Sequence, residues 1–225
     1  MFAMLASLPL KKRLVIIALC VLAIGFVLLL VFRPQQATSK PDAALDVNTN
    51  VTTTTELVPS WAPVEGPFGA KVTIVEFLDF QCQGCGGYFP VLKQMRDEFK
   101  GKIKFVARQF PIVEIHQYAL GAAIASVCAE RQGKFFEYAD TLFVNQQYLR
   151  RQDLEKYAEE LGLDTQKFDT CLDDPTAQAQ VVSDRKSGEL IGVKFTPSIY
   201  INGKLMETLV SPEELRKMIQ AELAK

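Results

Sequence analysis

Two cysteines stand two residues apart in this chain, as Cys82-Gln83-Gly84-Cys85, immediately after the apolar segment Val72–Phe80. The apolar segment predicts a buried strand, and the residues that follow Cys82 predict a helix. At the N-terminus of a helix, free backbone N–H groups and the helix dipole stabilise a thiolate. Two intervening residues let both sulfurs meet within one turn, so the pair can alternate between a dithiol and a disulfide. The CxxC therefore restricts the chain to folds in which a strand leads directly into a helix that carries a redox pair.

The alternative for a CxxC is half of a zinc site, which needs two further ligands at a matching spacing. The other cysteines, Cys20, Cys128 and Cys171, are isolated in the sequence, and His116 is the single histidine. The sequence therefore favours redox chemistry. No motif indicates a metal or a prosthetic group, so we expect neither.

Length and charge limit the number of domains and the kinds of partner that the chain can have. The 225 residues suffice for one good core but not for two large domains. The chain has 26 acidic and 25 basic residues, a net charge of -1, so nucleic acid is not an expected partner.

The N-terminus is predicted to be a membrane anchor. Leu14–Phe32 is an unbroken apolar run of about 19 residues, which matches the thickness of the hydrocarbon core. Lys11-Lys12-Arg13 precede it, so residues 1–13 are expected in the cytoplasm and everything after Arg33 outside. A cleaved signal peptide is the alternative, but its apolar region is usually shorter and ends in small residues. We therefore expect an uncleaved signal anchor at residues 14–32.

Residues 33–60 are predicted to be a flexible linker. They contain Pro34, Pro41 and Pro59 together with the threonine-rich run Asn48–Thr55, and they show no helical period. A single globular domain is then expected at residues 61–225.

The order of elements in this domain predicts a mixed α/β fold. Apolar residues occupy both faces of the first strand, as expected for a central, covered strand. Asn202-Gly203 predicts a hairpin turn, and Ser211 with Glu214 predicts a capping box for a final helix. The predicted strands are residues 71–80, 103–110, 198–202 and 205–208, and the predicted helices are residues 82–100, 117–131, 134–145, 151–161, 176–191 and a last one after Ser211.

Several segments of the domain together resemble the DsbA-type thiol–disulfide oxidoreductases of the thioredoxin superfamily. They are Phe77–Cys85 with its CxxC, the stretches Gly133–Phe135 and Leu161–Asp164, and Gly192–Gly203 with its Thr-Pro pair. Membrane-anchored members of the BdbD kind, with one span before the domain, are the most similar. The resemblance covers residues 61–225 and implies a thioredoxin-like α/β fold with a helical insertion at about residues 112–191.

The resemblance also implies an activity and a location. It implies a membrane-tethered, extracytoplasmic oxidoreductase, in the periplasm or on the outer face of the cytoplasmic membrane, that forms disulfides in exported, cysteine-containing clients. A membrane redox partner would reset the CxxC. The best-known members have Pro and often His where this chain has Gln83 and Gly84, so one source of thiolate stabilisation is missing. A reductase or isomerase acting on the same clients therefore stays open, as does a client-binding module without redox activity.

Site residues follow from the same resemblance. Cys82 would be the nucleophile, Cys85 the buried resolving cysteine, and Gln83 and Gly84 the active-site loop. Thr196-Pro197 resembles the cis-proline loop of the family, in which the Thr196 backbone would pair with an extended client segment. An ordinary trans proline in a loop is the alternative.

Two further assignments concern buried groups. Glu76 shares a strand face with apolar residues, so it is expected to be buried, and the family places an acid there that moves a proton to or from the resolving cysteine. Pairing with Lys104 for structure is the alternative, and both can hold together. Cys128 and Cys171 correspond to a second, structural disulfide found in some members, which an extracytoplasmic compartment favours over two free thiols. His116 is expected to be a loop residue rather than a catalytic one.

Overall fold

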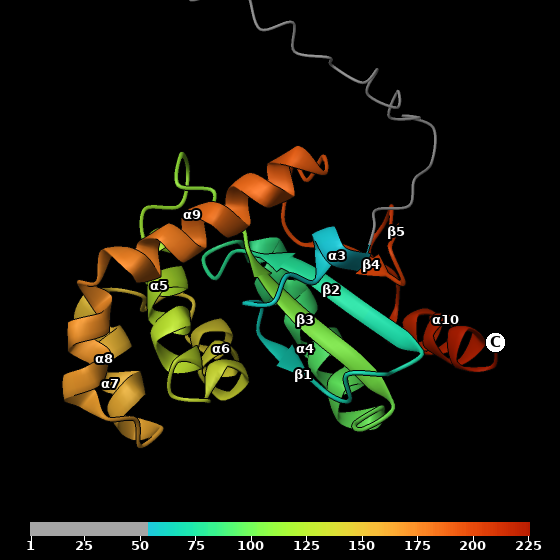
Figure 1. Cartoon of the computed structure of the whole chain (residues 1–225), viewed down its shortest axis with the longest axis horizontal. Helices are drawn as coiled ribbons and strands as arrows, with labels where there is room; N and C mark the ends of the chain where they lie inside the picture. Colours follow the sequence, from blue (N-terminus) through green and yellow to red (C-terminus); the bar gives the residue numbers. More distant parts are fainter. Residues whose placement is uncertain (1–53) are drawn as a thin grey trace, which may run out of the picture. The chain divides into compact units, whose positions relative to one another are not determined.

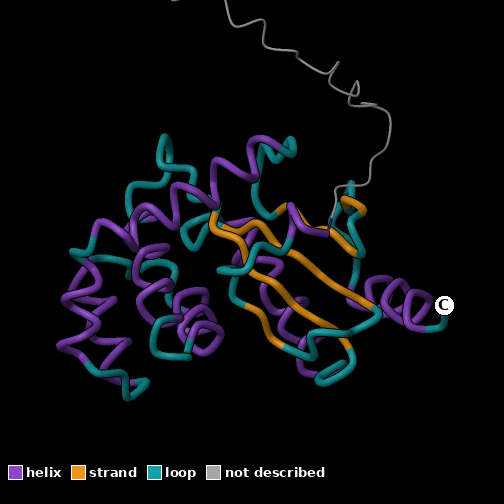
Figure 2. Tube along the Cα trace, in the orientation of Figure 1, coloured by secondary structure: helices purple, strands orange, loops and turns teal. Residues whose placement is uncertain are grey.

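The computed structural model of the chain describes residues 54–225, which form a mixed sheet surrounded by helices (Figures 1 and 2). The strands are β1 (Val64–Glu65), β2 (Val72–Leu78), β3 (Ile103–Gln109), β4 (Ser198–Ile201) and β5 (Lys204–Leu205). The helices are α3 (Thr54–Leu57), α4 (Gln83–Glu98), α5 (Ala119–Glu130), α6 (Phe135–Val144), α7 (Arg151–Glu160), α8 (Thr165–Leu172), α9 (Pro175–Leu190) and α10 (Pro212–Leu223). The predicted thioredoxin-like α/β fold is thus confirmed, and β1, α3 and α8 are added to the predicted elements.

The five strands are ordered β1-β3-β2-β4-β5, so β2 lies at the centre, as its two apolar faces predict. β2 and β3 are parallel, with Glu76 opposite Ala107, whereas β2 and β4 are antiparallel, with Glu76 opposite Ile199. A parallel pair requires a crossover, and α4 supplies it. The strand that precedes the CxxC is therefore held on both sides, and its end cannot move independently of the sheet.

Two apolar layers hold the sheet between helices. On the face of Ile74, Phe105 and Ile201, the core is completed by α4 and α10. On the opposite face, Val75 and Phe77 pack with residues that include Leu57 of α3. Each strand alternates its side chains between these two layers, so the middle of the sheet is covered on both sides.

The helical insertion between β3 and β4 consists of α5 to α9. Figure 1 shows α5 to α8 beside the sheet, and α9 running from them back across one face of the sheet. At Gly188 of α9 an added Cβ would lie 2.9 Å from ring atoms of both Phe77 and Phe110. The absence of a side chain at this position therefore allows the close approach of α9 to the sheet.

The end of the predicted linker packs against the domain. Thr54–Leu57 forms α3, and Leu57 is 1% exposed in the core. The carbonyls of Glu56 and Leu57 each accept a hydrogen bond from Arg108 Nη1 at 2.9 Å, while Arg108 Nε donates to Asp184 Oδ1 at 2.8 Å. The expectation of a flexible segment is therefore wrong for these residues, because tertiary contacts stabilise a helix that is too short to show a period. The division of the chain into domains at residue 60 stays a prediction.

The predicted anchor at residues 14–32 lies outside the described residues, as do residues 1–13 and most of the linker. Within residues 54–225 no helix combines the length and apolar character that a membrane crossing needs.

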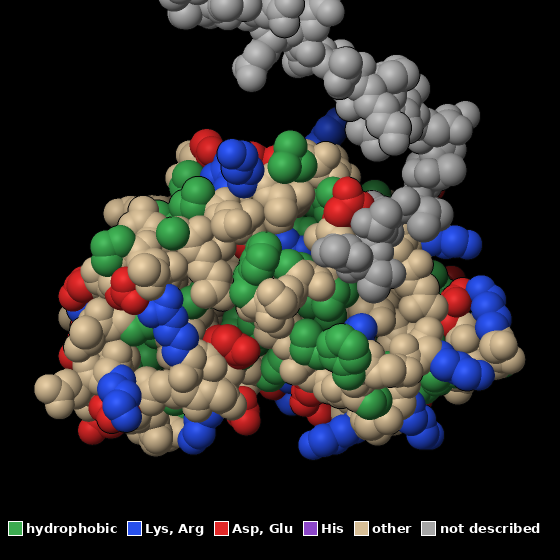
Figure 3. Space-filling view, in the orientation of Figure 1, with side chains coloured by type: hydrophobic (Ala, Val, Ile, Leu, Met, Phe, Trp, Pro, Cys, Tyr) green, Lys and Arg blue, Asp and Glu red, His purple; other side chains and the backbone are tan. Residues whose placement is uncertain are grey.

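Figure 3 shows apolar side chains gathered over the middle of the viewed face, with acidic and basic side chains distributed around them. Neither sign of charge dominates this face, in agreement with the near balance of acids and bases in the sequence.

Candidate functional site

The CxxC stands where β2 passes into α4. Cys82 immediately precedes the helix with an extended backbone, φ -69° and ψ 122°, and its carbonyl accepts the first helical hydrogen bond from Gly86 N at 3.1 Å. Cys82 is partly exposed, whereas Cys85, one turn further on, is buried. The two sulfurs therefore differ in access: only one of them can be reached by another protein.

Cys82 is surrounded by groups that stabilise its thiolate. The pKa of Cys82 is lowered from 9.0 to about 5, first by a hydrogen bond from the Cys85 thiol and further by the backbone N–H groups of Cys85 and Gly84, against the opposing effect of burial. The Thr196 side chain also lowers this pKa. Near neutral pH the exposed sulfur is thus ionised.

The environment of Cys85 raises the pKa of its thiol, in contrast to that of Cys82. Burial is the main cause that raises its pKa well above the ordinary value, and the nearby negative charges of Glu76 and Cys82 add to it. The Asp79 N–H donates to Cys85 Sγ at 3.5 Å and only partly offsets this effect. Cys85 therefore remains a thiol at a pH at which Cys82 is a thiolate.

The Thr196–Pro197 peptide bond is cis and lies against the CxxC. When Cys82 carries its proton, its Sγ donates to the Thr196 carbonyl at 3.3 Å. An added Cβ at Gly84 would lie 3.4 Å from Pro197 Cδ and 3.6 Å from Cys82 Sγ, so the active-site loop and the proline loop are in close proximity. The cis geometry predicted from the sequence is present.

Glu76 is buried on the sheet face that leads to the CxxC, as predicted, with 4% of its surface exposed. Burial raises its pKa from 4.5 to about 8, the negative charge of Cys82 adds to the effect, and Arg96 opposes it. Its Oε1 has no hydrogen-bond partner among residues 54–225, which is costly for a carboxylate but less so for a neutral acid. Glu76 therefore holds a proton near neutral pH.

The alternative role of Glu76, as a structural partner of Lys104, is contradicted by the register of the strands. Lys104 lies opposite Thr73 in the parallel register, one residue out of step with Glu76 opposite Ala107. Because successive side chains alternate between the faces of a sheet, Lys104 is on the other face. Its Nζ instead lies 5.3 Å from the centre of the Phe68 ring.

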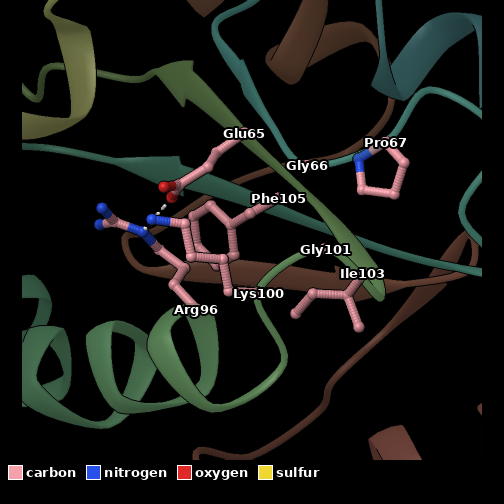
Figure 4. A pocket seen from close by; sticks show the side chains of 8 residues that line it. All are labelled: Glu65, Gly66, Pro67, Arg96, Lys100, Gly101, Ile103 and Phe105. Carbon is pink, nitrogen blue, oxygen red and sulfur yellow. Dashed lines mark hydrogen bonds and ion pairs between the residues drawn. The ribbon is translucent and has the colours of Figure 1, made fainter.

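Arg96 of α4 is the cation that acts on Glu76, but its charge is already compensated. Its Nε donates to Glu65 Oε2 and its Nη1 to Asp140 Oδ1, both at 2.8 Å. Figure 4 shows the guanidinium directed at the Glu65 carboxylate beside the ring of Phe105. A pocket of about 290 Å³ adjoins this group, and neither cysteine is part of its lining. We therefore place the reactive site at the CxxC and not at this pocket.

The loop between β2 and the CxxC is held by groups that the sequence did not reveal as site residues. The Asp79 carboxylate accepts from the backbone N–H groups of Gln81 and Ile112, each at 2.8 Å, and its Oδ2 lies 2.7 Å from His116 Nδ1. His116 lies in a loop, in agreement with its prediction, but it contacts the site through Asp79. An acid at the end of an apolar strand was the one available signal for this network.

A second attachment comes from the helical insertion. Gln146 Nε2 donates to the carbonyls of Phe80 and Cys82, at 2.8 and 2.9 Å. Gln81 Oε1 accepts from the backbone N–H of Tyr118 at 2.7 Å. No sequence pattern marks either glutamine, since both act through positions far away in the chain.

The second cysteine pair is joined. Cys128 of α5 and Cys171 of α8 form a disulfide with an S–S distance of 2.08 Å, and both residues are buried. The predicted disulfide is thus present, and it links two helices of the insertion.

Comparison with known proteins agrees with this geometry. A family model described as Thioredoxin matches residues 62–221. The Na(+)/H(+) antiporter NhaA 3 of Salinispora tropica is 36% identical over 141 residues, which cover 63% of this chain and 22% of that protein. The Na(+)/H(+) antiporter NhaA of Herminiimonas arsenicoxydans is 31% identical over 158 residues, 70% of this chain and 25% of that protein. The chain thus spans about a quarter of the length of these curated relatives.

Solved structures share the fold. The crystal structure of oxidised BdbD from Bacillus subtilis matches with a TM-score of 0.66 and 24% identity, over 73% of this chain and 94% of that one. The thiol-disulfide exchange protein alpha-DsbA2 from Wolbachia pipientis matches with a TM-score of 0.67 and 22% identity, over 74% and 90%. The chain belongs to the thioredoxin family, and its fold is that of the DsbA-like structures to which the sequence shows a resemblance.

Proposed function

We propose that this protein introduces disulfide bonds into exported proteins, from a position tethered to the membrane and outside the cytoplasm. The observation that carries the proposal is the asymmetry of the dithiol. Cys82 is accessible and its pKa is lowered to about 5, whereas Cys85 is buried and its pKa is raised. An accessible sulfur that is stable as a thiolate is what a disulfide donor requires.

The reaction is an exchange in two steps. A client thiolate attacks Cys82 Sγ of the oxidised enzyme, the Cys82–Cys85 bond breaks, and Cys85 leaves with the electron pair. A second client thiolate attacks the client sulfur of the mixed disulfide and displaces Cys82 as a thiolate. The client gains a disulfide, and the enzyme becomes a dithiol with two more electrons, which a membrane redox partner must accept.

The low pKa of Cys82 favours this direction. A thiol with a low pKa is a good leaving group, and stabilisation of its thiolate stabilises the reduced enzyme, which makes the disulfide a stronger oxidant. Gln83 and Gly84 replace the residues of the best-known members, yet the groups that stabilise the Cys82 thiolate are Cys85, Thr196 and two backbone N–H groups. These donors do not depend on the identity of the two intervening side chains.

Glu76 is proposed as the proton donor and acceptor for Cys85. When Cys85 leaves as a thiolate it lies in a buried environment that disfavours its charge, so it needs a proton at once. Glu76 has a pKa raised to about 8 and acts electrostatically on Cys85. A neutral acid at this position can give a proton to Cys85 and take it back when the disulfide re-forms.

Thr196 is proposed to bind the client. Its carbonyl lies 3.3 Å from Cys82 Sγ and accepts from the protonated thiol, and an extended client segment paired with the Thr196 backbone would place its own cysteine beside Cys82. Phe195, directly before it, is 56% exposed and offers an apolar contact. Clients are thereby selected by backbone shape and an apolar side chain rather than by charge.

Tethering is proposed from the sequence. Residues 14–32 would anchor the protein in the membrane and the following residues would let the domain reach exported clients and a membrane redox partner. A periplasmic thioredoxin-like protein from Salmonella enterica serovar Typhimurium shares the fold, with a TM-score of 0.65, which supports an extracytoplasmic location.

The test is a transfer experiment with the oxidised full chain in detergent and a reduced peptide that contains two cysteines. We expect the peptide to leave as its disulfide and the enzyme as a dithiol, both measured by mass spectrometry. Cys82→Ala should transfer nothing. Cys85→Ala, loaded at Cys82 with glutathione, should accumulate a peptide–enzyme adduct when the peptide carries a single cysteine. A peptide that stays reduced beside an oxidised enzyme would refute the proposed direction, and a reductase or isomerase would remain.

A further inference from the structure

Gln146 connects the helical insertion to the reactive cysteine. It lies in the turn after α6, and its Nε2 donates to Phe80 O at 2.8 Å and to Cys82 O at 2.9 Å. Cys82 O also accepts from Gly86 N at 3.1 Å, within the first turn of α4. The same carbonyl is thus bound by the helix that stabilises the thiolate and by an amide from another part of the fold.

Close packing accompanies these hydrogen bonds. An added Cβ at Gly86 would lie 1.9 Å from Gln146 Oε1 and 2.5 Å from its Cδ. The amide of Gln146 therefore lies directly on the first turn of α4, and any side chain at position 86 would have to displace it. Hydrogen bonding and packing independently indicate that this contact sets the position of the helix start.

The position of the helix start matters for the thiolate. Of the donors that stabilise Cys82, the thiol and N–H of Cys85 and the N–H of Gly84 lie in this first turn, while Thr196 acts from the proline loop. Those in the first turn reach the sulfur only while the Cys82 backbone keeps its extended conformation before the helix. An amide is also neutral, so it can fix the carbonyl without adding a charge that would act on the sulfur.

We propose that Gln146 is a positioning residue, whose amide fixes the Cys82 carbonyl from the helical insertion and so keeps the first turn of α4 in the geometry that stabilises the thiolate. The inference rests on the proposed function, since a stabilised Cys82 thiolate is what leaves in the second exchange step. It assigns a role in the chemistry to the insertion, in addition to covering the site.

The experiment measures the ionisation of Cys82 in the reduced full chain, from the rate of its alkylation against pH, with the labelled peptide identified by mass spectrometry. Gln146→Met keeps the approximate size of the side chain and removes both donors. We expect the midpoint of the alkylation rate against pH to rise by about one pH unit in this variant. Below the midpoint this corresponds to a roughly tenfold smaller fraction of Cys82 thiolate. Gln147→Met, the same change at the next position, should titrate as the wild type.

Gly86→Ala perturbs the same contact from the α4 helix instead of from Gln146. Its Cβ should displace the amide and raise the midpoint as Gln146→Met does. In the double variant the two shifts should not add, because no amide remains to be displaced. A single alanine in a helix does not by itself prevent folding, so this arm gives a result even where Gln146→Met lowers stability.

The outcomes separate the inference from the proposed function. A midpoint that is unchanged in both Gln146→Met and Gly86→Ala would overturn the inference, as would additive shifts in the double variant. Failure of the wild-type chain to transfer its disulfide to the peptide would refute the proposed function. That failure is seen in another assay and leaves the titration of Cys82 valid.

Discussion

Glu76→Gln should change how the stability of the domain depends on pH. In the folded protein the pKa of Glu76 is raised from 4.5 to about 8 by burial. Between these values the folded state keeps a proton that the unfolded chain has released. Because the folded state then binds more protons, the free energy of unfolding falls as pH rises. The loss of stability caused by ionising Glu76 is absent below its pKa in the unfolded chain and complete above its pKa in the folded protein.

The expected magnitude follows from the interval between the two pKa values. Each pH unit within it changes the free energy of unfolding by roughly 1.4 kcal/mol, so the total is on the order of 5 kcal/mol. Cys82 acts with the opposite sign, because its pKa is lowered from 9.0 to about 5 and stability due to it rises with pH over that range. This contribution is present in both the variant and the wild type, so it largely cancels when one free energy of unfolding is subtracted from the other.

The assay is urea unfolding of residues 48–225, with the CxxC reduced and Cys128–Cys171 intact, at several pH values between about 5 and 8. The variant should gain stability over the wild type by roughly 1.4 kcal/mol per pH unit, whatever the fixed cost of burying an amide. Glu207→Gln, at an exposed position after β5, is the matched control and should show no such slope. A pH-independent difference between Glu76→Gln and the wild type would refute the argument that burial keeps Glu76 protonated.

Three further predictions follow from the packing and the cysteines. A fragment that begins at residue 60 should unfold at a lower urea concentration than one that begins at residue 48, because it lacks Leu57, whose burial contributes about 1.5–3 kcal/mol; equal midpoints would contradict the role given to α3. Graded reductant should open Cys82–Cys85 before Cys128–Cys171, since catalytic disulfides are the more oxidising ones; stepwise alkylation and mass spectrometry would show this, and labelling of both pairs at one concentration would argue against it. Gly188→Ala should destabilise the domain by about 1–3 kcal/mol through overpacking, because its Cβ would lie 2.9 Å from the Phe110 ring; an unchanged thermal midpoint would exclude that clash.

Elements decided by short-range chemistry were predicted well. Asn202 and Gly203 both adopt positive φ, 48° and 83°, as their hairpin signal requires. Ser211 and Glu214 form the predicted capping box at the start of α10. In both cases the residues that specify the turn or the helix start interact with residues only a few positions away in the chain.

Elements decided by distant partners were missed. β1 is two residues long, and its Val64 pairs with Val106, so no alternation is available to reveal it. Lys104 was the alternative partner considered for Glu76 because the two strands are neighbours, but the register places it on the opposite face. The register depends on how the whole sheet is packed, and the sequence of either strand alone does not determine it.

The sequence by itself determined the CxxC at the start of a helix, the buried Glu76 in a central strand and the pair of cysteines available for a second disulfide. The first two follow from apolar pattern and spacing, which act over a few residues, while the pairing of the two cysteines was implied by the family resemblance. Only the tertiary structure decided which groups surround Cys82. Thr196 is 114 positions away and Gln146 is 64 positions away, and each contact exists because the insertion and the sheet fold back on the same loop. Residues this far apart in the chain come into contact only when the complete core packs, and a local sequence pattern carries no information about that packing.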